Sequence, residues 1–269
     1  MNGRLTVLLL AGARGPDDPV ARASGVASKA LAPVGGMPML DRVVETLQRQ
    51  SRIGRILLVA DTNPAAAEAF GKMGQRAGVE LLRQGPSPAA TVEAILAGLT
   101  ADSYPLLLTT ADHPLLSDAM IDSLLALTPH DADIGVGLAD ANTVMAAWPQ
   151  SIRTVTKLGG VGYCGCNLFL LRSPRAAGAV RFWRHMERNR KKPWRLVAAA
   201  GLPTLWRYLT GRLDLAGAFE RLSTLTGATV RAVLLPQPEA AIDVDKPEDL
   251  VLVERILAQR GSPQVPPGR

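Results

Sequence analysis

The sequence predicts an α/β fold, in which a mostly parallel sheet lies between two layers of helices. Apolar runs of strand length occur at 4–11, 54–60 and 105–110, and segments with helical spacing lie between them. The runs are apolar throughout rather than alternating, which is typical of strands buried on both faces of a parallel sheet. A chain of 269 residues, 47% of them hydrophobic, can bury one core of this size.

Each element follows from its local pattern. The first run, RLTVLLLA, ends at Gly12, and a polar loop rich in glycine and proline occupies 12–28. The segment 38–50 repeats apolar side chains with helical spacing, at Leu40, Val43, Val44 and Leu47. Further along the chain we expect a strand at 54–60, a helix at 64–77, strands at 79–82 and 105–110 with a helix at 89–100 between them, and short strands at 134–138 and 167–172.

The domain organisation is simple. We expect one domain over residues 1–260, with a helical insertion at about 174–225. A long basic helical stretch fills 174–198 within it. The tail at 261–269, GSPQVPPGR, has the composition of a disordered segment.

Positive charge is concentrated in the insertion. The net charge is +6, and seven cations fall within fifteen residues: Arg181, Arg184, Arg188, Arg190, Lys191, Lys192 and Arg195. One interpretation is a solvated helix with tryptophan on its apolar face. The alternative is a contact with an anionic acceptor or an anionic membrane, because arginine and tryptophan are common at membrane surfaces.

Composition also excludes several classes of protein. No apolar run is long enough to span a bilayer, and the start MNGRLTVLLLAG lacks a signal-peptide cleavage pattern, so a cytoplasmic location is expected. Cys164 and Cys166 are too close for a normal disulfide and have no partners at zinc spacing. We therefore expect two buried thiols.

The loop after the first strand is a candidate phosphate site. Its backbone N–H groups, at Leu10, Ala11, Gly12 and Ala13, could cradle a triphosphate, and Arg14 and Lys29 add positive charge. It matches neither a Walker A motif nor a dinucleotide fingerprint. A tight turn with a solvated arginine is the alternative, but Lys29-Ala30-Leu31 followed by VGGMPML favours the phosphate site.

Two acidic segments each follow a predicted strand. Asp112 ends the strand at 105–110, at the sheet edge where α/β proteins bind ligands. It could instead cap a helix, but Asp118 is better placed to do so. Asp243 and Asp245 are spaced i, i+2, so on a strand they would point to the same side and suit one hard cation. Glu248 and Asp249 could be ordinary first-turn acids of the next helix.

These motifs resemble the nucleotidyltransferases with a Rossmann-like, glycosyltransferase-A-like fold, which include molybdenum-cofactor guanylyl- and cytidylyltransferases. The resemblance implies that Asp112 binds Mg²⁺ (or Mn²⁺) and that the second ligand is Asp245, with Asp243 as the weaker candidate. It also implies that Arg14, Lys29 and Asp112 are catalytic. The chain departs from the family at Ala13-Arg14-Gly15, which leaves Arg22 as an alternative to Arg14 at the phosphates.

Two further segments match positions that form pockets in the resembled family. Gly85, Pro86, Ser87 and Thr91 stand where relatives recognise the nucleotide base, although any Gly-Pro-Ser-Pro turn would look the same. Asn167, with Lys157, is the candidate for binding the acceptor. An asparagine in an apolar strand could equally have a structural partner. His113 is expected to shape its loop rather than act as a base.

The resulting functional hypothesis is transfer of a nucleoside monophosphate, CMP or GMP favoured, from an NTP to a small phosphorylated or anionic acceptor. Pyrophosphate is released. The alternatives are a glycosyltransferase of the same fold that uses a nucleotide-sugar, and a non-catalytic nucleotide-binding protein. The expected partners are the NTP and the acceptor, with no nucleic acid. Neither the oligomeric state nor the identity of the acceptor follows from the sequence.

Overall fold

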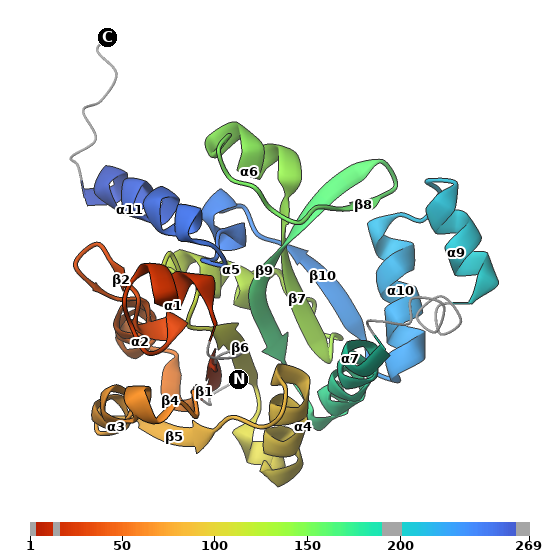
Figure 1. The fold of residues 1–269 in the computed structure, drawn as a ribbon. Helices are drawn as coiled ribbons and strands as arrows, with labels where there is room; N and C mark the ends of the chain where they lie inside the picture. The colour runs from red at the N-terminus through yellow and green to blue at the C-terminus, as the bar shows by residue number, and fades with distance from the viewer. Residues whose placement is uncertain (1–3, 13–16, 190–200, 262–269) are drawn as a thin grey trace.

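The structure is a computed structural model, which describes residues 4–12, 17–189 and 201–261. A twisted sheet runs through the middle of the molecule and helices cover both of its faces (Figure 1). The predicted α/β fold with a mostly parallel sheet is therefore confirmed.

The sheet has the strand order β10-β7-β9-β6-β1-β4-β5, and β8 pairs with β9 outside this path. The strands are β1 (Leu5–Ala11), β4 (Ile53–Ala60), β5 (Val79–Arg83), β6 (Leu106–Thr110), β7 (Ile134–Asp140), β8 (Thr156–Leu158), β9 (Val161–Leu171) and β10 (Val230–Leu234). All neighbours pair in parallel except at β9, which is antiparallel to β6, β7 and β8. A separate hairpin joins β2 (Pro33–Val34) to β3 (Met37–Pro38).

Central strand β1 shows why the runs are apolar throughout. Val7 and Leu9 pack on one side, in a cluster with Leu40 and Phe70 from the helices of that layer. Leu8 faces the other side and packs with Val92. The helices are α1 (Pro19–Ala23), α2 (Met39–Arg49), α3 (Ala67–Gly74), α4 (Pro88–Gly98), α5 (Asp118–Leu127), α6 (Ala141–Ala147), α7 (Ala177–Asn189), α9 (Leu202–Leu209), α10 (Leu215–Thr226) and α11 (Pro247–Gly261).

Most element boundaries differ from the sequence predictions by a few residues, but some differences are larger. Helix α6 and strand β8 lie where no element was predicted. The loop expected over 12–28 contains α1, whose first turn is capped by the carboxylate of Asp18. Strand β9 begins six residues before the predicted strand at 167–172. Strand β10 lies where no element was expected.

The predicted insertion consists of α7, α9 and α10 within its described part, and it is not separate from the core. Val180 of α7 and Phe219 of α10 pack in the same cluster as Leu8 of the central strand. The basic helix predicted over 174–198 is confirmed up to Asn189. The stretch 190–200 lies outside the described residues, as does the predicted tail from residue 262 onward. None of the described helices combines the length and the apolar character needed to cross a membrane.

Candidate active site

The chain order of the strands creates a crevice at one edge of the sheet. From β1 the chain builds β4 and β5 on one side, then returns to place β6 on the other side of β1. The loops that leave β1 and β6 therefore diverge, and ligands bind α/β sheets at such a switch point. A cavity lies there, lined by Leu10, Ala11, Gly12, Asp18, Lys29, Ala30, Ala111 and Asp112.

Part of the candidate phosphate loop borders this cavity. Leu10, Ala11 and Gly12 line it. Ala13 and Arg14 lie outside the described residues. Arg22, the alternative to Arg14, is exposed on α1.

Lys29 reaches the acidic residues. It begins a short 3₁₀ turn, Lys29–Leu31. Its Nζ donates to Oδ2 of Asp112 at 2.7 Å and to Oδ1 of Asp245 at 2.8 Å. Burial lowers the pKa of Lys29, but the two carboxylates outweigh this effect and hold the pKa above its ordinary value. The lysine is therefore charged and stabilises negative charge at the bottom of the crevice.

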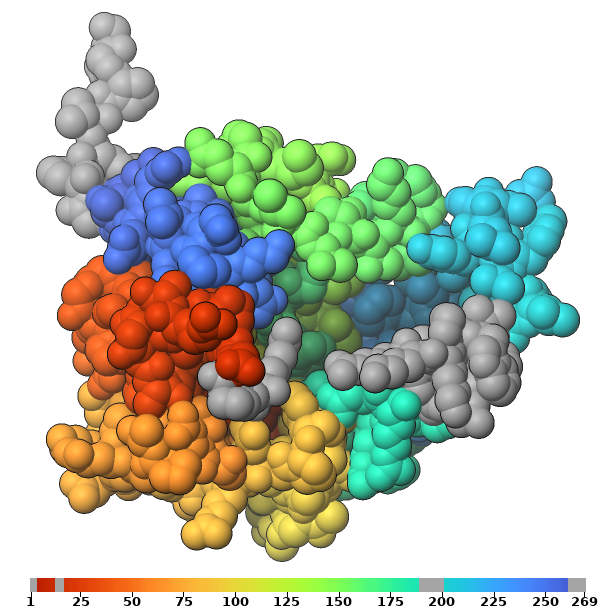
Figure 2. Space-filling model, viewed as in Figure 1, coloured from red at the N-terminus to blue at the C-terminus, as the bar shows by residue number. Residues whose placement is uncertain are grey.

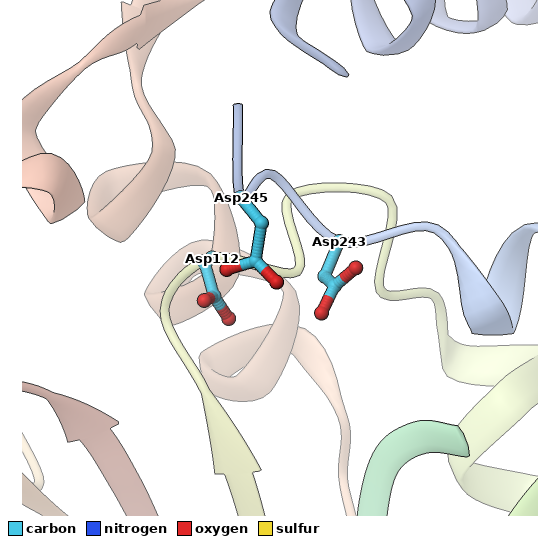
Figure 3. A group of neighbouring side chains, drawn as sticks. All are labelled: Asp112, Asp243 and Asp245. Atoms are coloured by element: carbon cyan, nitrogen blue, oxygen red, sulfur yellow. The ribbon is translucent and has the colours of Figure 1, made fainter. Parts of the chain in front are cut away.

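Three carboxylates meet beside this lysine. Asp112, Asp243 and Asp245 each offer an oxygen within 4.8 Å of the others, and Figure 3 shows them gathered in one place. Oδ1 of Asp112 is buried and finds no hydrogen-bond partner among the described residues. Burial, with the charges of Asp112 and Asp245, raises the pKa of Asp243 to about 6 despite the nearby Arg153.

A backbone hydrogen bond joins the two acidic segments. The N–H of Val244, between the two aspartates, donates to the carbonyl of Asp112 at 2.8 Å. Val244 itself is fully buried. The strand expected here is absent, because residues 242–246 form an irregular segment between a 3₁₀ turn (Pro238–Ala241) and α11. The i, i+2 spacing still brings Asp243 and Asp245 to one site, since the residue between them is anchored in the core.

No motif in the sequence singles out Arg153. Its buried guanidinium donates to the carbonyl of Asp243 at 2.9 Å and to Oδ1 of Asp243 at 2.6 Å. It also binds Oδ1 of Asp249, whose Oδ2 accepts from the N–H groups of Asp245 and Lys246 at 2.9 Å each. Asp249 is therefore more than a first-turn acid, because it holds the turn that carries Asp245.

Asn167 lies beside the same cluster. Its Nδ2 donates to Oδ2 of Asp243 at 2.9 Å, which supplies the structural partner considered for it. Its φ of 49° is the only positive value at a non-glycine residue in the described chain. Such backbone is strained and tends to occur at functional sites. Lys157, the other acceptor candidate, is exposed on β8, and no contact between it and the aspartates is present.

The predicted base-binding loop is held by its own side chains. Oγ1 of Thr91 accepts from the N–H of Gly85 at 2.8 Å and donates to the carbonyl of Ser87 at 2.7 Å. Ser87 caps α4 and also donates to the carboxylate of Glu187 on α7. The side chain of Gln84, which precedes this loop, lies directly against Gly12. The loop containing Pro86 therefore adjoins the phosphate loop.

Two expectations around Asp112 have different outcomes. Asp118 is not the helix cap, because Ser117 caps α5 by accepting from the N–H of Met120, and Asp118 is the first helical residue. His113 is fully buried, and its Nε2 lies 3.4 Å from the carbonyl oxygen of Glu239. Burial lowers the pKa of His113 to about 4, so the imidazole is neutral near pH 7. This agrees with a residue that shapes the loop.

Comparisons with known proteins agree with this architecture. A MobA-like NTP transferase domain family matches residues 7–228. A hypothetical transferase from Thermus thermophilus is similar at 28% identity and a TM-score of 0.75, covering 92% of this chain and 99% of that one.

More distant structures share the fold. A 4-diphosphocytidyl-2C-methyl-D-erythritol synthase from Anaerococcus prevotii has a TM-score of 0.59 at 11% identity, covering 95% of this chain and 96% of that one. A CMP:2-keto-3-deoxy-manno-octonic acid synthetase, solved with CTP, has a TM-score of 0.58 at 13% identity, covering 96% of this chain and 100% of that one. The comparison with curated proteins gave no match. Because the family match spans most of the sequence, this chain belongs to the MobA-like NTP transferase domain family, whose members are nucleotidyltransferases.

Proposed function

We propose that the chain transfers a nucleoside monophosphate, with CMP or GMP favoured, from an NTP to a small phosphorylated or anionic acceptor. The observation that carries this proposal is the meeting of Lys29 with Asp112, Asp243 and Asp245 at the switch point of the sheet. Two distant neighbours support the cytidylyl option, because one is a 4-diphosphocytidyl-2C-methyl-D-erythritol synthase and the other a CMP-sugar-acid synthetase solved with CTP.

The three carboxylates fit Mg²⁺ or Mn²⁺, which prefer oxygen ligands. Asp112 contributes a buried oxygen that finds no hydrogen-bond partner among the described residues, and Asp243 and Asp245 complete the set. Lys29 pairs with Asp112 and Asp245, whereas Arg153 divides its charge between Asp243 and Asp249. Bound there, the ion would neutralise charge that develops on the phosphates.

The reaction needs little further chemistry from the protein. An acceptor oxygen attacks the α-phosphorus in line, its new bond to phosphorus forms, and the bond to the bridging oxygen breaks so that pyrophosphate leaves with the electron pair. Lys29 would hold the triphosphate, together with the backbone N–H groups around Gly12 and with Arg14. An ionised phosphate acceptor carries no proton, so the buried, neutral His113 is not needed as a base.

The direct test is a screen of four NTPs against candidate acceptors, with pyrophosphate release as the readout. Asp112→Ala should reduce turnover by about 10²–10³-fold, the usual effect of losing one charge-stabilising group. Asp118→Ala is the matched control, because this exposed acid lies on the same segment outside the cluster. Retention of more than about a hundredth of the activity in Asp112→Ala would refute the assigned role. Sugar release from a nucleotide-sugar, without pyrophosphate release from any NTP, would favour the glycosyltransferase alternative.

A further inference from the structure

Helix α9 presents an apolar stripe to solvent. Leu202, Leu205, Trp206 and Leu209 follow the i, i+3, i+4, i+7 spacing of one helix face. Such a stripe normally packs on a core, yet no residue of this helix is buried. The exposed fractions are 77% for Leu202, 55% for Trp206 and 72% for Leu209. A contiguous apolar patch of this kind marks a binding surface.

A cation borders this stripe, because the guanidinium of Arg212 stands 5.2 Å from the centre of the Trp206 ring. Arg207 lies on the other side of the helix, toward Gly217 of α10. The nearby carboxylate of Asp214 is engaged as the cap of α10, where it accepts from the N–H of Gly217. In the sequence, the stretch RKKPWRLVAAA, which contains four cations, ends one residue before α9 begins.

The position of α9 leaves this face accessible. Together with α10 it forms the cyan lobe at the right edge of Figure 2, which projects from the body of the molecule. We call five exposed residues along the stripe and its border the α9 surface: Leu202, Trp206, Tyr208, Leu209 and Arg212.

We propose that the α9 surface binds the surface of an anionic phospholipid bilayer. Leucine side chains would enter the acyl boundary, Trp206 and Tyr208 would sit at the level of the headgroups, and Arg212 would meet the lipid phosphates. A second copy of the chain is a poorer partner, because pairing two α9 surfaces would bring their arginines together on proteins of net charge +6. Helix α9 has eight residues, so it lies on the bilayer and does not cross it.

The test uses the full chain and vesicles of phosphatidylcholine with or without phosphatidylglycerol. The protein should float with the anionic vesicles, ignore the neutral ones and dissociate at high salt. Each cation near an anionic surface contributes about fivefold to binding, so Arg212→Gln should weaken it roughly fivefold. Leu202→Ser with Leu209→Ser should weaken it at least about tenfold, since each buried methylene contributes roughly fourfold.

Matched controls lie on the other side of the molecule. Arg49→Gln removes an exposed cation from α2, and Val251→Ser removes an apolar side chain that is 59% exposed on α11. Both should bind vesicles like the wild type. A second readout needs no destabilising change: tryptophan emission should shift to the blue with anionic vesicles, and Trp206→Phe should remove most of that shift.

Three results would overturn the proposal. The first is equal binding to neutral and anionic vesicles, or no binding to either. The second is binding that is reduced neither by Arg212→Gln nor by Leu202→Ser with Leu209→Ser. The third is self-association in sedimentation experiments that Leu202→Ser with Leu209→Ser abolishes, because the α9 surface would then be a contact between copies. None of these outcomes bears on nucleotide transfer, which is measured separately with soluble acceptors.

Discussion

Replacing Arg153 by methionine tests whether the acidic cluster depends on a buried guanidinium. The arginine side chain is only 8% exposed and ion-pairs with Asp243 and Asp249, which are 24% and 12% exposed. Methionine keeps most of the apolar stem but leaves two carboxylates without their countercharge. Removing one partner of a buried ion pair costs 3–5 kcal/mol, and the partial exposure of Asp243 favours the lower end. We therefore expect a loss of about 3 kcal/mol in the free energy of unfolding.

A loss of this size is easy to measure. For a chain of this length it corresponds to a fall of roughly 6–12 °C in Tm, and urea denaturation gives the free energy directly. Arg55→Met is the control, since Arg55 pairs with Glu80 at 2.6 Å while both side chains are about half exposed. Exposed pairs contribute less than about 1 kcal/mol. An equal loss in the two variants would refute the assigned role of Arg153. So would a double-mutant cycle with Asp249→Asn that gave no coupling energy.

Three further predictions concern charge. Lys29→Ala should weaken NTP binding and Lys192→Ala should not, as measured by calorimetry; equal weakening would mean that the nucleotide site is misplaced. Mg²⁺ at about a hundred times its Kd should stabilise the wild type by about 2.7 kcal/mol and have no such effect on Asp112→Ala, as measured by thermal shift. Burial raises the pKa of Asp133, but hydrogen bonds from Ser173 and Thr229, with Arg175, outweigh this and hold it below its ordinary value. The ionised Asp133 therefore stabilises the fold above its unfolded-state pKa, and this stabilisation is lost as pH falls through its folded-state pKa. Asp133→Asn should lower the free energy of unfolding more at pH 6 than at pH 3. An equal loss at both pH values would contradict this prediction.

The central sheet could be predicted because its strands are buried on both faces. A strand such as β1 has apolar residues on each side, and this run is visible without any knowledge of its neighbours. Strand β10 was missed because it is short and Arg231 interrupts its apolar run; only Val230 and Val233 of its five residues are buried. The first half of β9 was missed because glycines and cysteines interrupt its pattern; both cysteines are buried and free, as expected.

The acidic residues of the site could be predicted, but their interactions could not. Asp112, Asp243 and Asp245 each occupy a recognisable motif, and the structure brings them together. The partners of Asp243 depend on tertiary structure: Arg153 is 90 residues away and comes from a loop with no pattern of its own. Lys29 likewise depends on tertiary structure, because it binds carboxylates that lie 83 and 216 residues away in the sequence. Charge pairing over such separations leaves no periodic signal in a single sequence.

The basic helix α7 contacts the proposed nucleotide site, although the sequence placed it in an insertion. It packs beside α4 and is joined to it by an ion pair between Arg184 and Glu93. Its Glu187 accepts a hydrogen bond from Ser87, in the loop expected to recognise the base. The positive charge of α7 is therefore not all directed to solvent. Arg184 forms an ion pair with Glu93, whereas Arg188 is exposed. It follows that changes in α7 can alter the loop around Ser87 directly. Charge reversal along α7 could therefore change both vesicle binding and nucleotide transfer. Substitutions confined to α9 test vesicle binding alone.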